Sequence, residues 1–171
     1  MSRVPACLAL LLLSITGCGY HTAGRASRLP SNIRVLAVPA FVNQTTTYKI
    51  EQTLTAAVVE ELNTRTRYHV VSDPRSADAT LRGTVLAALA TPLTYDTTTG
   101  RASTVLVVVS MEVVLTDTKG RPLYQNPSYV FREQYQVSQQ LSTFFEEDSP
   151  AFKRLSGEFA RTLVSNILEG F

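Results

Sequence analysis

Cys18 is the residue whose neighbours most clearly predict a chemical modification. Ile15, Thr16 and Gly17 come directly before it, and small residues at this point are typical of a signal-peptide cleavage site. An apolar residue, two small residues and a cysteine together match a bacterial lipobox, in which diacylglycerol alkylates the thiol and the amine freed by cleavage is acylated. Several acyl chains on one terminus anchor a protein stably. The alternative is an ordinary signal peptide with a stray cysteine.

The segment before Cys18 has the parts of a secretory signal. Arg3 gives it a positive start, and the run 8–15 is apolar apart from one serine. This run is too short to span a bilayer, which takes about 20 residues. Residues 19–32 lack periodicity and contain Gly, Ser and Pro, as a tether does. We therefore expect a signal peptide, a lipidated N-terminus with its tether, and one domain, over residues 1–17, 18–32 and 33–171.

The remaining composition excludes several classes of protein. Cys7 lies in the signal and Cys18 carries the lipid, so no thiol pair is left for an internal disulfide. The formal charge of +2 falls to +1 once Arg3 is removed. A chain so close to neutrality lacks the basic stripe that nucleic acid favours. No later segment is long and apolar enough to cross a membrane.

The residue types that could support catalysis or metal binding are scattered. There is no nucleophile elbow, zinc-protease helix or phosphate loop. His21 and His69 stand alone, without a nearby thiol, and are therefore expected to be surface or structural residues. The acidic run 146–148 precedes a predicted helix, where carboxylates favour the positive end of the dipole. We expect no enzyme, no metal site and no cofactor apart from the covalent N-acyl and S-diacylglycerol lipid on Cys18.

The first half of the domain alternates between strand and helix patterns. Residues 33–41 are apolar on both faces and predict an inner strand that ends or bulges at Pro39. Residues 48–66 carry one apolar row at every fourth position, which predicts an amphipathic helix capped by Thr46 or Thr47. That row is Ile50, Leu54, Val58 and Leu62. Residues 68–72 are either a short strand or an extended lead-in.

Three strands and a helix follow. The run 80–91 places Leu81, Val85, Ala87 and Leu89 on one face, with Gly83 where a neighbour can come close. The runs 104–116 and 123–137 are joined by a tight turn at 117–120, which predicts an antiparallel hairpin. The residues expected on one face are Val105, Val107, Val109, Met111, Val113 and Leu115 in the first run and Tyr129, Phe131, Tyr135 and Val137 in the second. After Ser149 as N-cap and Pro150, an apolar stripe predicts the last helix. Its members are Phe152, Leu155, Phe159, Leu163 and Ile167. The order β-α-β-β-β-α predicts an α+β fold, a single mixed four-stranded sheet with two helices on one face.

The far face of this sheet is half apolar and has no helix left to cover it. Its apolar members are Leu86, Ala88, Leu106, Val108, Val114 and Val130. Such a surface needs a partner. Either the loops 92–102 and 138–148 fold over this face, or a protein or an amphiphilic ligand docks there.

Several short motifs, taken in order, resemble the LptE family of lipopolysaccharide-assembly lipoproteins. The most specific is the lipobox that runs into Cys18-Gly19-Tyr20-His21. The others are Leu-Pro, Pro-Ala-Phe-Val-Asn-Gln-Thr, Ala-Asp-Ala, Phe-Phe-Glu-Glu and a final Leu-Glu, at residues 29–30, 39–45, 77–79, 144–147 and 168–169. Each motif is weak alone. Their order and spacing, over essentially the whole chain, carry the resemblance.

The resemblance implies two helices on one side of a four-stranded sheet, and it implies partners. Members of this family lie inside the β-barrel LptD as a plug, help that barrel to assemble and bind lipopolysaccharide. Gly19 after the lipidated cysteine fits export to the outer membrane, where the anchor would sit in the inner leaflet and the domain would face the periplasm. The chain departs from better-known members in the threonine-rich segment 94–104, so ligand contacts do not transfer from them.

Candidate ligand residues therefore come from chemistry. A lipopolysaccharide headgroup carries phosphates or carboxylates, for which arginine is the better match. The candidates are Arg101 in a loop, Lys119 and Arg121 at the hairpin turn, and Arg132 on the uncovered face. Each could also be an ordinary solvated charge, and the loop 94–104 could instead contact the barrel.

Two rival functions remain open. Lipoprotein domains of the LpoB and CsgG type also have a strand ending in Pro-x-Phe-x-Asn-x-Thr before a helix, and they regulate a peptidoglycan synthase or form a secretion complex. A secreted enzyme is the other alternative, but no nucleophile and base pair suggests itself. The Cys-Gly-Tyr-His and Phe-Phe-Glu-Glu motifs favour the lipopolysaccharide reading.

Overall fold

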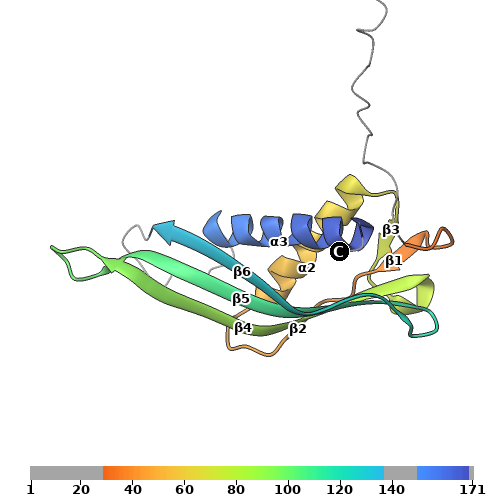
Figure 1. Cartoon of the computed structure of the whole chain (residues 1–171), viewed down its shortest axis with the longest axis horizontal. Helices are drawn as coiled ribbons and strands as arrows, with labels where there is room; N and C mark the ends of the chain where they lie inside the picture. Colours follow the sequence, from red (N-terminus) through yellow and green to blue (C-terminus); the bar gives the residue numbers. More distant parts are fainter. Residues whose placement is uncertain (1–28, 137–149, 170–171) are drawn as a thin grey trace, which may run out of the picture.

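The computed structural model describes residues 29–136 and 150–169 of the chain. Its elements are β1 (Val35–Ala37), β2 (Val42–Asn43), α2 (Ile50–Arg65), β3 (His69–Val71), the 3-10 helix η2 (Pro74–Ser76), β4 (Ala79–Tyr95), β5 (Ala102–Asp117), β6 (Pro122–Gln136) and α3 (Pro150–Glu169) (Figure 1). Cys7, Cys18, His21, the acidic run 146–148 and the predicted cap Ser149 lie outside the described residues. No described helix is both long and apolar enough to cross a membrane.

The strands form one mixed sheet in the order β3-β1-β4-β5-β6, with β2 also pairing with β4. β1 runs parallel to β3 and β4, whereas β4, β5 and β6 are antiparallel neighbours. The predicted α+β class with two helices is confirmed. The four-stranded count and the order β-α-β-β-β-α are wrong, because the described sheet has six strands.

Two local features explain the additional strands. The apolar run 33–41 is divided at Pro39, which has no N–H to donate to a strand partner, so β1 ends at Ala37 and β2 begins at Val42. Both pieces lie along the same edge of β4. The short run 68–72 is a true strand, since β3 pairs with β1 from His69 to Val71. The sequence pattern could not separate a three-residue strand from a lead-in.

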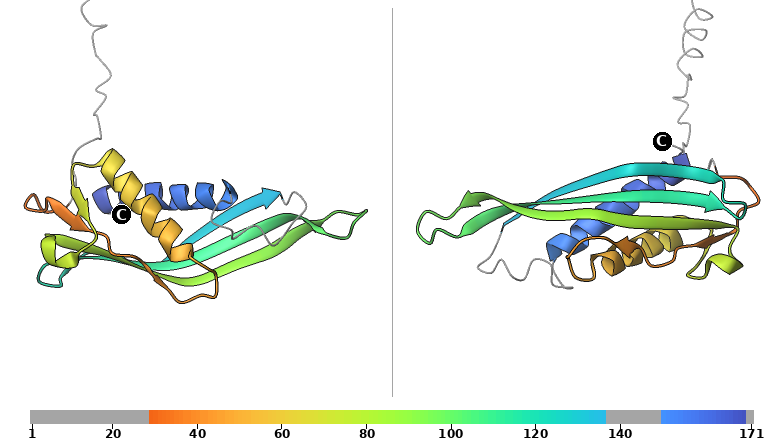
Figure 2. Two further views of the ribbon diagram at one scale, coloured as in Figure 1. Left: turned by 180° about the vertical axis from the view of Figure 1, so that it is seen from behind. Right: turned by 90° about the horizontal axis from the view of Figure 1, so that it is seen from below.

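Both helices pack on one face of the sheet, and the opposite face carries no described element (Figures 1 and 2). The predicted row on α2 is fully buried, as is the predicted stripe on α3, namely Phe152, Leu155, Phe159, Leu163 and Ile167. They meet the inward side chains of β5, which are Val105, Val107, Val109, Met111, Val113 and Leu115. These three predictions of inward faces are confirmed.

Aromatic rings fill the space between α3 and β6. Tyr129 stacks on Phe131 with ring centroids 5.3 Å apart, and Phe159 meets Phe131 edge-on at 4.7 Å. The Tyr129 hydroxyl accepts hydrogen bonds from Tyr124 and from the Asn166 amide. Burial and the neighbouring Tyr124 raise the pKa of Tyr129 above its ordinary value, so this group stays neutral and serves as a polar tie inside the core.

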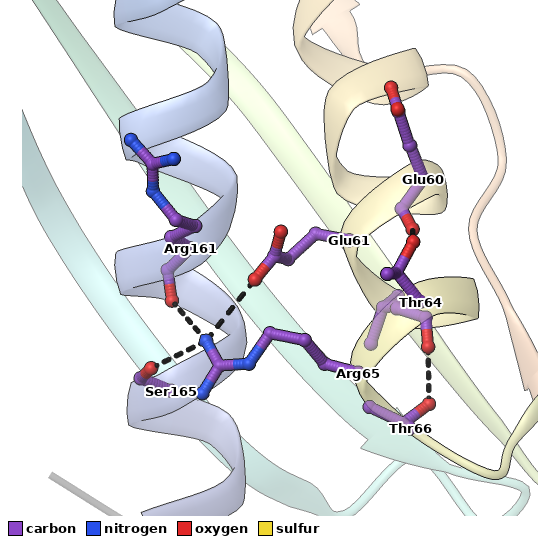
Figure 3. Close-up of polar contacts among 8 residues, drawn as sticks. Glu60, Glu61, Thr64, Arg65, Thr66, Arg161 and Ser165 are labelled. Atoms are coloured by element: carbon purple, nitrogen blue, oxygen red, sulfur yellow. Dashed lines mark hydrogen bonds and ion pairs between the residues drawn. The ribbon is translucent and has the colours of Figure 1, made fainter.

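Arg65 joins the two helices at their solvent side (Figure 3). Its Nη1 donates to Glu61 Oε1 at 3.2 Å on α2, and to Ser165 Oγ at 3.0 Å and the Arg161 carbonyl at 3.4 Å on α3. Arginine suits this position because one guanidinium offers several donors in a fixed plane. The side chain therefore holds the C-terminal turn of α2 against α3.

The N-terminus of α2 differs from the prediction. The N-cap is Lys49, in the left-handed region at φ 54°, and no side chain caps the helix. Thr46 and Thr47 do not serve as caps because the preceding turn uses this segment: Asn43 Nδ2 donates to the Thr47 carbonyl, and Thr47 N–H donates to Thr45 Oγ1. The helix consequently starts at Ile50, the first residue of the buried row.

Gly83 lets the chain before α2 approach β4 closely. A methyl group at this position would meet the ring of Phe41 at 2.9 Å, and Phe41 is itself buried. The predicted close approach at Gly83 is confirmed, and the neighbour is an aromatic ring.

A β-bulge at Leu86 shifts by one position the alternation of inward and outward side chains along the rest of β4. Val85 pairs with Met111, but Ala87 pairs with Ser110 and Ala88 with Val109. The extra residue reverses the alternation. Ala88 therefore packs against the core, while Leu89 is 60% exposed. The predicted inward placement of Ala87 and Leu89, and the outward placement of Ala88, are corrected accordingly.

Candidate functional site: the uncovered sheet face

The face of the sheet that lies opposite the helices is defined by cross-strand pairs. Leu89 pairs with Val108, which pairs with Arg132; Thr91 pairs with Leu106, which pairs with Gln134. Residues directly opposite each other in antiparallel strands point to the same side. We call this surface the outer face and define its centre as Leu86, Leu89, Leu106, Val108, Val130 and Arg132.

The centre of the outer face is apolar and open. Leu89 is 60% exposed, and Leu86 and Val130 are each 40% exposed, while Leu106 and Val108 are half-buried between their neighbours. Leu93 and Tyr95, further along β4, are also largely exposed. Single exposed apolar side chains are ordinary, but a contiguous group on one flat surface is typical of a binding site.

Cationic and amide groups accompany this apolar surface. Arg132 is exposed beside Val108, and Gln134 follows on the same face. Arg82, which sequence reasoning did not single out, is exposed beside Val114 on the same side of β4. The neighbouring Glu133 points to the helix side, where it lies 3.6 Å from Arg154. The outer face can therefore hold an apolar group and an anionic group together.

The loop 92–102 does not fold over the outer face. Residues 92–95 extend β4, and only 96–101 form the turn that leads into β5. Asp96 organises this turn, because its carboxylate accepts from the N–H groups of Thr98 and Thr99, and these hydrogen bonds lower its pKa. The hairpin projects past the helices (Figure 1). The other predicted cover, 138–148, lies outside the described residues.

The four predicted ligand cations do not form one site. Arg101 lies at the β4–β5 turn, whereas Lys119 and Arg121 lie at the β5–β6 turn. The 16 residues of β5 separate the two turns, about 50 Å at about 3.4 Å per residue. Arg121 is also bound to Asp117, with Nη2 and Oδ2 2.7 Å apart. Of the four, only Arg132 lies on the outer face.

No group of residues suited to hold a metal ion is found among residues 29–136 and 150–169. His69 is exposed on β3. Asp78 binds backbone: its carboxylate accepts from Val35 N–H at 2.9 Å and Arg34 N–H at 2.8 Å. These two hydrogen bonds hold the pKa of Asp78 below its ordinary value.

Residues 33–167 match the family LptE, described as lipopolysaccharide-assembly. No curated protein matches the chain.

Several solved bacterial proteins have a similar fold. A lipoprotein from Caulobacter crescentus has 14% identity and a TM-score of 0.52 over 78% of this chain and 88% of that one. Lipoprotein B from Nitrosomonas europaea has 12% identity and a TM-score of 0.53 over 80% and 84%. A protein from Chlamydia trachomatis has 9% identity and a TM-score of 0.54 over 78% and 95%. At these identities the likeness concerns the fold.

Proposed function

The chain belongs to the LptE family of lipopolysaccharide-assembly proteins, and from this we propose that it is the outer-membrane lipoprotein component of the machinery that transports lipopolysaccharide. In this proposal Cys18 carries the lipid, the anchor sits in the inner leaflet and the domain faces the periplasm. The domain acts as plug and assembly factor for an LptD-like β-barrel, and it binds lipopolysaccharide.

The outer face is the observation that supports a partner most directly. Helices bury the other side of the sheet, whereas Leu86, Leu89 and Val130 remain 40–60% exposed. Removing an apolar surface of this kind from water stabilises a complex by about 25 cal/mol per Å². The acyl part of an amphiphile offers a matching surface, and so would an apolar patch on the otherwise polar inner wall of a barrel.

The candidate cations fall into two groups, those on the outer face and those at the turns between strands. Arg132 and Arg82 lie on the outer face with the exposed apolar side chains, whereas Arg101 lies at the β4–β5 turn. A ligand with acyl chains and phosphates would contact the first set, because arginine binds phosphate through two hydrogen bonds. Lys119 and Arg121 lie at the opposite end of β5 from Arg101 and off the outer face, so we do not expect them to contact the same ligand.

Co-purification tests the barrel partner. The full-length chain, solubilised from outer membranes in detergent, should bring down a barrel of LptD size in stoichiometric amount. Leu89→Arg and Val130→Asp should reduce that yield, because each places a charge in the apolar centre. Ala56→Arg, at an exposed position of α2, is the matched control and should leave the yield unchanged. Equal recovery from all variants would contradict docking through the outer face.

Photocrosslinking tests ligand binding independently of the barrel. A photoreactive residue at position 132 should crosslink to lipopolysaccharide, and one at 119 should do so much less. A crosslink from position 101 would show that the β4–β5 turn also contacts lipopolysaccharide. Absence of crosslinks at all three positions would remove ligand binding from the proposal and leave the plug role.

A further inference from the structure

One end of the sheet gathers segments that are distant in sequence. β1 begins beside His69 of β3, and its Leu36 lies beside Ala79, the first residue of β4. Ala79 in turn pairs with Asp117, the last residue of β5. The start of the domain, the loop before β3, η2 and the β5–β6 turn therefore lie together (Figures 1 and 2). We call this the proximal end, because the chain enters the domain here at Leu29.

The proximal end is rich in exposed cations. They are Arg34, Arg67, Arg75, Lys119 and Arg121, with His69 among them. The acidic residues at this end are Asp73, Asp78 and Asp117. Asp73 pairs with Arg75 at 3.0 Å and Asp117 with Arg121 at 2.7 Å, while Asp78 binds the backbone of β1.

Three of these cations are not fixed in an ion pair by any described carboxylate, although the charge of Arg34 also acts on Asp78. Among the described residues, the side chains of Arg34, Arg67 and Lys119 form no ion pair, and all three are exposed. They come from three separate segments, before β1, before β3 and in the β5–β6 turn. The fold therefore brings three exposed basic side chains to one end of the sheet, an arrangement that no local run of sequence contains.

The length of the tether brings this surface to the membrane. Ten residues lie between Cys18 and Leu29, and the eleven steps that they make span at most about 36–40 Å when fully extended and about 17–20 Å on average for a flexible linker of that length. The β4–β5 turn lies about 50 Å further along β5. An anchor on Cys18 would hold the proximal end near the headgroups, and at such a high effective concentration weak contacts can set the orientation of the domain.

We propose that the proximal end docks on anionic phospholipid headgroups of the leaflet that holds the anchor, through Arg34, Arg67 and Lys119. This inference rests on the proposed lipid anchor. Each basic side chain near an anionic surface strengthens association by about fivefold. Before the domain enters the barrel, docking stands the sheet away from the membrane with its outer face free along its length, so the lipid fixes the position of the domain and the cations fix its orientation.

Fluorescence quenching in vesicles tests the orientation. The full acylated chain is reconstituted in phosphatidylethanolamine alone or mixed with phosphatidylglycerol, with a quencher on the lipid headgroups. The mature sequence has no cysteine besides Cys18, so Thr118→Cys and Thr98→Cys place a single fluorophore at the proximal or the distal turn. We expect strong quenching at 118 and weak quenching at 98 in anionic vesicles. Quenching at 118 should fall without the anionic lipid and in 1 M salt.

A charge-matched pair of variants identifies the residues. Arg34→Gln/Arg67→Gln/Lys119→Gln should lose the quenching at 118, whereas Arg82→Gln/Arg101→Gln/Arg132→Gln should keep it; circular dichroism confirms that both fold. Equal quenching at 118 with and without anionic lipid, or a proximal triple variant that behaves as wild type, overturns the docking. Mass spectrometry that finds no acyl chains on Cys18 overturns the anchor and the docking together. Failure of the docking alone leaves barrel co-purification intact.

Discussion

At the scale of single residues, Gly83 and Phe41 show how a contact across the core restricts one position. The Phe41 ring occupies the space that a side chain at 83 would need. Phe41 is held in turn by its backbone, since its N–H donates to Thr55 Oγ1 at 3.0 Å. The pair locks the segment before α2 onto β4, so the glycine serves packing and no turn.

Gly83→Ala should lower the free energy of unfolding by about 1–3 kcal/mol, because the buried ring must shift. Gly157→Ala is the matched control. Gly157 lies inside α3 with open space around it, and alanine there should raise stability by about 0.4–1 kcal/mol. Urea denaturation of both variants measures the difference, and equal stability of the two would contradict the contact with Phe41.

The carboxylate of Asp78 should make stability depend on pH. Backbone hydrogen bonds from Val35 and Arg34 lower its pKa from the ordinary 3.8, so the stabilising contribution is present above pH 3.8 and is lost as the pH falls through the lower folded pKa. Asp78→Asn should therefore flatten the fall in unfolding free energy on acidification.

This effect is measured by denaturation at a series of pH values from neutral to acid. Asp73, Asp96 and Asp117 also have lowered pKa values, so the Asp78→Asn chain should keep part of the acid sensitivity. A pH profile identical to that of the wild type would show that the Asp78 carboxylate does not stabilise the start of β1.

At the scale of elements, β4 decides the composition of the outer face. Its bulge at Leu86 turns Leu89 outward and brings Ala88 toward the core. Alternation along a strand is regular in sequence only while the strand has no extra residue, and nothing in the local composition marks this bulge. The sequence therefore predicted the apolar outer face correctly but misassigned part of β4.

Truncating two leucines of β4 tests this reversal. Leu81→Ala should cost about 2–5 kcal/mol, because Leu81 is fully buried. Leu89→Ala should change stability by no more than about 0.5 kcal/mol, because most of that side chain already faces water. Thermal or urea unfolding compares them, and a large loss at Leu89 would place this residue back in the core.

At the scale of the molecule, the sheet is covered on one side only. Two helices, joined by Arg65 at their solvent face, are enough to bury the inward rows. The distal hairpin extends past them, and the proximal end carries the entering chain. This arrangement leaves a long apolar surface for a partner and a charged end for orientation.

Depleting the protein should reduce both the mature LptD-like barrel and the lipopolysaccharide at the cell surface, because the proposed assembly role makes the barrel depend on this protein. Immunoblotting of outer membranes and surface labelling of lipopolysaccharide measure the two quantities. Complementation with Leu89→Arg should fail where Ala56→Arg succeeds. Normal levels of both barrel and lipopolysaccharide after depletion would rule out the assembly role.

The sequence by itself determined the class of fold, the inward rows of α2, β5 and α3, and the tight turn at Gly120, whose φ is +75°. These follow from local periodicity and backbone preference, which a single segment contains. Only the tertiary structure decided the six-stranded order, the reversal within β4, the separation of Arg101 from Lys119, and the meeting of Arg34, Arg67 and Lys119 at one end. Each of these depends on which strands pair and in which register, and pairing is a property of segments far apart in the chain.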